Sequence, residues 1–149
     1  MEKPETVKHA ALLWTTAVAA GIVETVLAVS EIAMASGIDG GVWMNVGLRS
    51  VVYIGALVLV AFFTRGKRWA RVSLAVLLSV IGLASMVVPA AAQIGDGDSF
   101  LVAFGGDGEF AIAFMVVRLL HIAAVATATI VMFSPSANRY FSKPELVTA

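Results

Sequence analysis

Four long apolar stretches, separated by short polar segments, dominate the 149-residue chain. An α-helix needs about 20 apolar residues to cross a hydrocarbon core about 30 Å thick, and each stretch meets that length. Strands of a membrane β-barrel would show short segments of alternating polarity instead, and none are seen. The pattern predicts an all-α, four-transmembrane-helix bundle. Its spans cover about residues 10–35, 42–63, 69–92 and 110–133 of a single membrane domain, 1–149, with a loop at 93–109.

The composition supports a membrane protein and excludes several other classes. Hydrophobic residues make up 60% of the chain and charged residues 13%, whereas soluble domains are nearer 45–50% and about 25%. Ten basic residues balance ten acidic ones, so the basic excess of a nucleic-acid-binding protein is missing. Cysteine is absent, which excludes disulfides, thiolate metal sites and cysteine nucleophiles.

The charges outside the spans sort by side of the membrane. Basic residues lie before the first span, between the second and third spans, and after the fourth: Lys3, Lys8, Arg65, Lys67, Arg68, Arg71, Arg139 and Lys143. The other two links carry acidic residues and no basic ones: Asp39, Asp96, Asp98, Asp107 and Glu109. Because basic loops stay in the cytoplasm, we expect a multi-pass protein of the cell (inner) membrane with both termini cytoplasmic (N-in/C-in).

The first span has a competing interpretation as a signal peptide. Ala33-Met34-Ala35 is similar to a small-residue cleavage site. However, the preceding stretch is long and contains Glu24 and Glu31, which the apolar core of a signal peptide would avoid. We therefore expect an uncleaved span.

Polar and ionisable residues inside the spans form the candidate site. They are Glu24, Glu31, Asn45, Arg49, Tyr53, Arg118 and His121. An unpaired charge at mid-span costs about 3 kcal/mol on insertion scales, so the two glutamates are expected to pair with the two arginines.

The depths of these residues agree with one cluster. At 1.5 Å per residue, Arg49 and Arg118 lie about 10 and 12 Å below the outer surface, between Glu31 at about 6 Å and Glu24 at about 17 Å. His121 lies one turn deeper than Arg118 on the same helix face. The sequence predicts one polar cluster of zero net charge in the outer half of the bundle.

Two interpretations of this cluster stay open. Buried ion pairs can fix helix register without doing chemistry. Alternatively, intramembrane Glu and His are typical of proton relays, and Arg of anion or headgroup capture. A polar cavity open to the outside beside Arg49 and Arg118 would favour the second interpretation, and tightly packed pairs without a cavity would favour the first.

Small residues and aromatic residues refine the expected packing. Ala17, Gly21 and Thr25 form a ridge of small residues at intervals of four, and the stretch 123–129 is rich in alanine and threonine. Small residues let helices approach closely. We expect them to lie inside the bundle, with a homodimer face as the alternative. Spans two and three are bulkier and are expected to face lipid more. Aromatic residues at membrane boundaries are expected to be Trp14, Trp43, Trp69 and Tyr140.

The outer loop 93–109 contains an apolar stretch, residues 100–104, between two runs rich in Asp and Gly. This stretch predicts a short interfacial helix or a lid on the bundle mouth. The Asp-Gly runs lack the ligand pattern of an EF-hand, so we expect a flexible acidic loop rather than a cation site.

Two short motifs carry a resemblance. The middle loop, residues 65–71, reads Arg-Gly-Lys-Arg-Trp-Ala-Arg, and residues 136–141 read Ser-Ala-Asn-Arg-Tyr-Phe. They resemble motifs of small four-span membrane proteins common in actinobacteria, an uncharacterised family. The chain departs from the usual form at Lys67-Arg68, where Arg-Asn is frequent. The resemblance implies the fold and the host, and no catalytic residues.

The sequence favours a non-enzymatic scaffold or accessory subunit stabilised by the cluster. The alternative is a small transporter, channel or lipid- or anion-binding protein that uses it. An enzyme is not expected, because no in-register histidine pair and no Ser-His-Asp set at one depth is present. No metal or cofactor is expected, and the expected partners are membrane lipids, a second copy of the chain or a larger membrane complex.

Overall fold

The computed structural model describes residues 2–142, and it is built from helices joined by short turns. Four of its helical segments are long and apolar enough to cross a membrane, which confirms the four-transmembrane-helix bundle. In chain order the elements are α1 (Glu5–Ala35), α2 (Gly40–Thr64), α3 (Arg68–Leu74), η1 (Ala75–Gly82), α4 (Leu83–Gly95), α5 (Phe100–Gly105), α6 (Ala111–Met132) and α7 (Pro135–Ser142). Lys143, used above to assign sidedness, lies outside the described residues.

The third span is one continuous rod made of α3, η1 and α4. Its middle part, η1, is a π-helix, a wider turn that often occurs at functional sites. Pro89 lies inside α4, which continues to Gly95. Pro89 therefore does not end the third span, because membrane helices tolerate proline where neighbouring groups satisfy the freed backbone.

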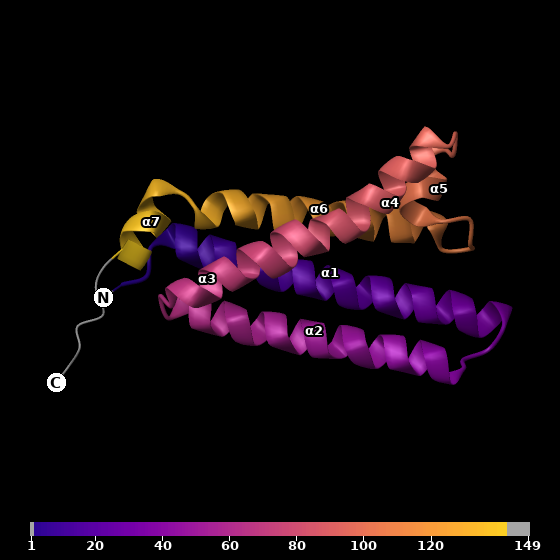
Figure 1. The fold of residues 1–149 in the computed structure, drawn as a ribbon, viewed down its shortest axis with the longest axis horizontal. Coiled ribbons are helices and arrows are strands. Elements are labelled where there is room, and N and C mark those ends of the chain that lie inside the picture. Colours follow the sequence, from indigo (N-terminus) through magenta and orange to yellow (C-terminus); the bar gives the residue numbers. More distant parts are fainter. Residues whose placement is uncertain (1, 143–149) are drawn as a thin grey trace.

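The third span crosses the bundle obliquely (Figure 1). Helix α1 packs against α6 along its length and also contacts α2. The third span begins beside α2, through α3, and ends beside α6 and α5, through α4. A hydrogen bond of 2.6 Å between Ser79 and Thr129 joins η1 to α6 at the crossing. The third span therefore lies close to α2 at its start and farther from α2 at its end, so a space opens between α2 and α4.

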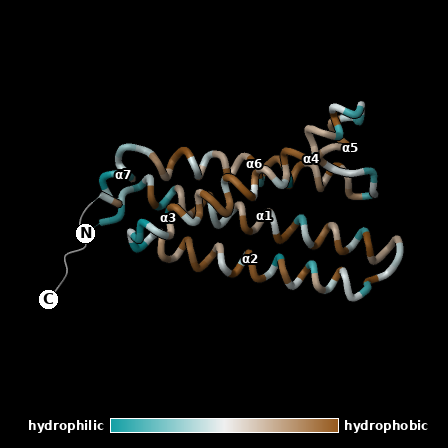
Figure 2. The backbone as a smooth tube through the Cα atoms, in the orientation of Figure 1, coloured by the Kyte–Doolittle hydropathy of each residue, from teal (hydrophilic) through white to brown (hydrophobic). Residues whose placement is uncertain are grey.

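The two ends of the bundle differ in charge, and Figure 2 shows hydrophilic residues gathered at both. We call the end with the turns at 36–39 and 96–110 the acidic end, and the end with the turn at 65–67 and α7 the basic end. Asp39 caps α2 at the acidic end by accepting a 2.9 Å hydrogen bond from Val42 N–H. At the basic end, Gly66 takes a φ of +79°, a conformation that favours glycine.

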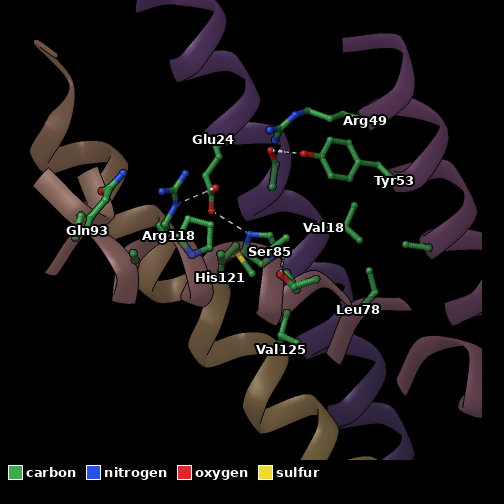
Figure 3. A pocket seen from close by; sticks show the side chains of 18 residues that line it. Val18, Glu24, Arg49, Tyr53, Leu78, Ser85, Gln93, Arg118, His121 and Val125 are labelled. Atoms are coloured by element: carbon green, nitrogen blue, oxygen red, sulfur yellow. Dashed lines mark hydrogen bonds and ion pairs between the residues drawn. The ribbon is translucent and has the colours of Figure 1, made fainter. Parts of the chain in front are cut away.

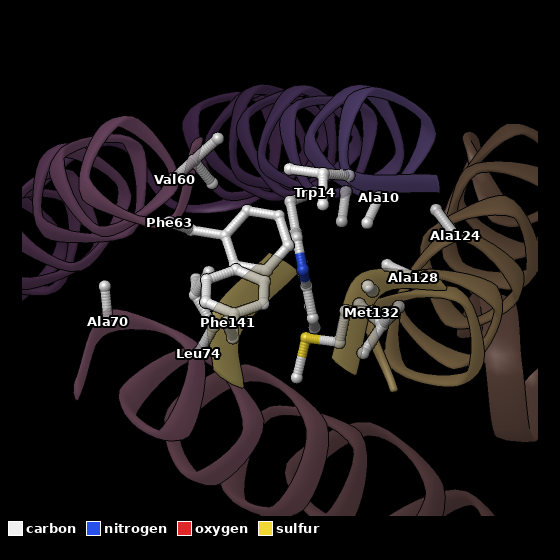
Figure 4. Close-up of a cluster of buried hydrophobic side chains, with 14 residues drawn as sticks. Ala10, Trp14, Val60, Phe63, Ala70, Leu74, Ala124, Ala128, Met132 and Phe141 are labelled. Carbon is white, nitrogen blue, oxygen red and sulfur yellow. The ribbon is translucent and has the colours of Figure 1, made fainter. Parts of the chain in front are cut away.

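The hydrophobic core lies in the basic half of the bundle (Figure 4). Trp14, Phe63, Leu74 and Met132 come from four different segments and are fully buried there. Trp14 therefore belongs to the core between α1, α2, α3 and α6, and its depth relative to a membrane boundary stays a prediction. Trp43, by contrast, is 64% exposed near the start of α2, as expected for an aromatic belt.

The two motifs of the resemblance contact each other at the basic end. Arg71 donates a hydrogen bond to the Asn138 amide oxygen, and its guanidinium lies 4.4 Å from the Phe133 ring centroid. Arg68 donates to the Phe141 carbonyl oxygen. The turn before α3 and the helix α7 thus close the basic end together.

The second and third spans are less buried than the first and fourth, as expected. The most apolar 18-residue window of the third span is 11% buried, against 28% for α1. In α2 three residues are buried, Ala56, Val60 and Phe63, whereas five are buried in the shorter α6. The third span is therefore the most exposed, because it contacts α2 and α6 only over parts of its length.

Candidate functional site

A buried glutamate on α1 joins two polar residues of α6. Glu24 is 5% exposed. Its Oε1 lies 3.0 Å from His121 Nδ1 and its Oε2 lies 3.6 Å from Arg118 Nε. Figure 3 shows the three side chains converging from the two helices. An ionised Glu24 accepts only, so His121 Nδ1 carries the hydrogen in that state.

The sequence accounts for this triad through helix periodicity. Arg118 and His121 are three residues apart and therefore share one face of α6. The Arg118 guanidinium also lies 4.6 Å from the centroid of the Phe114 ring, one turn toward the acidic end, within the range of a cation–π contact. Arg118 is thus held from two sides and stays 26% exposed at its side chain.

Tyr53 of α2 docks on the ridge of small residues on α1. Its hydroxyl donates a 2.7 Å hydrogen bond to the Gly21 carbonyl and lies 2.8 Å from Thr25 Oγ1. A Cβ on Gly21 would stand 2.9 Å from the Tyr53 ring, so this close approach requires glycine. The ridge therefore packs against Tyr53 inside the bundle, as expected.

Arg49 does not pair with a glutamate, contrary to the sequence expectation. Its Nε donates a 2.9 Å hydrogen bond to Asn45 Oδ1, one turn away on the same helix. Arg49 is exposed, and no carboxylate within residues 2–142 lies in ion-pair range of it. The expectation failed because equal depth does not place two helix faces opposite each other.

Glu31 also departs from the expected cluster. Its Oε1 accepts a 3.1 Å hydrogen bond from the Phe110 N–H, the residue that precedes α6. A carboxylate at a helix N-terminus is stabilised by the free N–H groups and the helix dipole. Glu31 therefore anchors the turn before α6 and is not an ion-pair partner for either arginine within the described chain.

A cavity of about 340 Å³ lies between α1, α2, the third span and α6. Five of the predicted site residues line it: Glu24, Arg49, Tyr53, Arg118 and His121. The lining residues on α1, such as Glu24, are buried and form the floor of the cavity, whereas Arg49 on α2 is exposed at its rim. The rim on the α4 side includes Ser85, Pro89 and Gln93, which the sequence analysis missed. Pro89 and Gln93 within an apolar run were the signal that could have drawn attention to this wall.

The charges on the cavity wall do not cancel. Two arginines and one glutamate line it, so the formal sum is 2 − 1 = +1 with His121 neutral. Zero was expected from two glutamates and two arginines, but Glu31 lines a different cavity, beside Asp107 and Glu109. A net positive, partly desolvated cavity attracts anions more strongly than cations.

A second cavity leads from the acidic end toward the first. It measures about 460 Å³ and lies between α1 and α2, with Asp39 at one end and Arg49 at the other. Asn45 and Thr25 also line it. Arg49 lines both cavities, so its side chain marks the place where they meet.

The apolar stretch of the long loop folds as α5, which confirms the expected short helix. It packs against α4 and α6, and Ala103 on α5 lines the first cavity. The approach to α6 is close, because a Cβ on Gly105 would clash with the Ala111 carbonyl. Helix α5 thus covers part of the acidic end of the cavity.

In the part of the chain that the structure describes, no group of three His, Asp or Glu side chains is placed to hold a metal ion. Glu24 and His121 by themselves form a hydrogen-bonded pair. The arrangement is suited to binding an anionic group.

Comparisons with known protein families, with curated proteins and with solved structures find no match to this chain. The resemblance to small actinobacterial four-span proteins therefore stays a prediction.

Proposed function

We propose that this protein is a non-enzymatic multi-pass membrane protein that binds an anionic ligand in the cavity beside Arg49 and Arg118. One observation carries the proposal: Arg49 lines a positively charged cavity with no carboxylate of the described chain in ion-pair range. A guanidinium that only neutralised a buried charge would be paired. Its remaining N–H groups can bind phosphate or carboxylate in a bidentate manner.

The other residues have supporting roles in this proposal. Glu24, which is itself bonded to His121, holds Arg118 in place, and the cation–π contact with Phe114 restrains its guanidinium. Tyr53 fixes α2 against α1 and so sets the distance of Arg49 from the cavity floor. A pre-arranged pair of guanidinium groups binds an anion without losing side-chain freedom at the moment of binding.

The access route favours the acidic end, which we propose to face the outside, as the basic segments predict. The second cavity reaches Arg49 from that end. On the basic side, the fully buried Trp14, Phe63 and Met132 close the bundle. A bundle that is accessible at the acidic end and closed at the basic end favours binding from one side over an open channel.

A scaffold role is the second candidate, and the Glu24–Arg118–His121 contacts favour it. Glu24 is buried and satisfied by two partners, as in a structural ion pair. A scaffold, however, has no need for the unpaired Arg49 beside a cavity.

The test measures binding of glycerol 3-phosphate, a small soluble phosphate monoester, to the purified full chain in neutral detergent. Arg49→Gln removes a charge-assisted hydrogen bond and should raise the dissociation constant about tenfold or more. The matched control is Arg139→Gln, an exposed arginine on α7, which should change it less than about twofold. Equal affinity of Arg49→Gln and the parent protein would contradict the proposal.

A further inference from the structure

We propose that the ligand is a membrane lipid with an anionic headgroup, taken from the leaflet at the acidic end, with one acyl chain in the apolar groove between α2 and η1. This inference rests on the proposed function and names the class of its ligand. It depends on a fourth cavity that adjoins the charged one.

The groove measures about 340 Å³ and its lining is apolar throughout. Val51, Val52 and Leu59 of α2 form one wall, and Leu77 and Leu78 of η1 form the other. Several of these side chains are exposed: Val51 is 68% and Leu77 is 49% exposed. The groove is therefore a depression in the lipid-facing surface of the bundle.

The charged cavity and the groove share two residues. Ala56 and Leu78 line both of them. The two cavities therefore adjoin at Ala56 and Leu78, and a molecule whose charged part contacts Arg49 can place an apolar tail in the groove. A free phosphate ion would fill only the charged part, whereas an amphiphile matches both.

The order of polar and apolar parts along the bundle matches a lipid in the leaflet at the acidic end. From Arg49, the groove residues Ala56 and Leu59 lie about 10 and 15 Å farther toward the basic end, at 1.5 Å per residue. The charged residues thus face the headgroup side of that leaflet and the groove faces its centre. A lipid of the opposite leaflet would present its charge to the wrong end.

The oblique course of the third span supplies the side opening. Its first part contacts α2, and its last part contacts α5 and α6. Ser85, Pro89 and Gln93 on α4 and Arg49 on α2 are consequently exposed on opposite rims of the charged cavity. A lipid can reach the cavity sideways through this opening while its acyl chains stay in hydrocarbon, where leaving would be costly.

Gly55 offers a variant that closes the groove and leaves the charged residues in place. It lines the groove but not the charged cavity. Apart from its own helix backbone and chain neighbours, no atom lies within 4 Å of where its Cβ would stand. Gly55→Leu therefore fills the groove without a backbone clash. Gly47 on the same helix has the same free space and lines none of the four cavities described here, so Gly47→Leu is the matched control.

The experiment compares three probes on the purified full chain in neutral detergent. They are dioleoyl phosphatidylglycerol, dioleoyl phosphatidylcholine with the same chains but no net charge, and glycerol 3-phosphate with no chains. We expect phosphatidylglycerol to bind at least tenfold tighter than either other probe. Gly55→Leu should weaken phosphatidylglycerol binding about tenfold, the equivalent of keeping two methylene groups out of the groove. It should leave glycerol 3-phosphate binding unchanged, and Gly47→Leu should change neither.

The outcomes separate this inference from the proposed function. If Gly55→Leu binds phosphatidylglycerol as the parent does while Arg49→Gln weakens both anionic probes, the lipid is excluded and a soluble anion remains. Equal affinity for phosphatidylglycerol and phosphatidylcholine would overturn the anionic headgroup. If Arg49→Gln leaves every probe unaffected, the proposed function itself is wrong.

Discussion

The same four spans form both halves of this bundle, but the basic half is closely packed and the acidic half contains a cavity. In the basic half, the side chains of Trp14, Phe63 and Met132 are fully buried, and α7 closes the end of the bundle. In the acidic half the walls diverge, and a charged cavity separates α2 from α4. The close packing of one half holds the helices while the other half stays open, so stability and binding are assigned to different residues.

The largest expected effect comes from removing the central side chain of the closed half. Trp14→Ala should lower the free energy of unfolding by about 3 to 5 kcal/mol, because a fully buried indole leaves a cavity. Trp43→Ala removes the same side chain from an exposed position and should cost less than about 0.5 kcal/mol. Denaturant unfolding in mixed micelles measures both. Similar losses would mean that the basic half is not closely packed.

Adding bulk should separate the halves in the opposite sense. Ala128 in the closed half is fully buried, and Ala90 on the cavity wall is 2% exposed. Ala128→Leu should destabilise by about 2 kcal/mol through overpacking. Ala90→Leu can extend into the cavity and should cost less than about 1 kcal/mol. Equal destabilisation in the same unfolding assay would indicate that the cavity is not present in solution.

A double-mutant cycle sharpens the assignment of the ion pair. Arg118→Ala and Glu24→Ala should couple by about 1 to 2 kcal/mol, because each single change leaves a charge without its partner. Arg118→Ala and Glu31→Ala should be additive within about 0.5 kcal/mol, since Glu31 binds the Phe110 N–H. Unfolding free energies of the singles and doubles give both values. Coupling to Glu31 instead of Glu24 would contradict the described contacts.

The smallest expected effect concerns the closure of the basic end. Arg71→Ala removes a hydrogen bond to Asn138 and a cation–π contact with Phe133, and it should cost about 1 kcal/mol. Arg139→Ala, on the same end but exposed, serves as the control and should be neutral within about 0.5 kcal/mol. Thermal unfolding in detergent is a sufficient measurement. A neutral Arg71→Ala would show that these contacts do not stabilise the closed half.

Sequence reasoning predicted the spans and the short helix at 100–104 because length and hydropathy alone determine them. It also grouped Glu24, Arg118 and His121 correctly, since helix periodicity and depth place them on facing surfaces. It failed for Arg49 and Glu31, because depth does not specify the rotation of a helix about its axis. Arg49 is bonded instead to Asn45 on its own helix, and Glu31 to the backbone N–H of Phe110 before α6.

The cavity itself could not be predicted from the sequence, although most of its polar lining residues could. Its opening depends on the oblique path of the third span, which follows from where η1 and α4 pack. An apolar stretch such as 75–95 contains no pattern that specifies such a crossing. The burial of Trp14 was not predictable for a related reason, since a tryptophan suits a membrane boundary or a core equally well.

Water access to the two halves tests the central claim most directly, and the absence of cysteine makes it measurable. Ser85→Cys on the cavity rim, Ala128→Cys in the closed half and Ser36→Cys in the acidic-end turn are each treated with a membrane-impermeant maleimide in right-side-out vesicles. We expect rapid labelling at residues 36 and 85 and labelling at residue 128 only after denaturation. Protection of residue 85 while residue 36 reacts, or equal labelling of residues 85 and 128, would contradict the central claim.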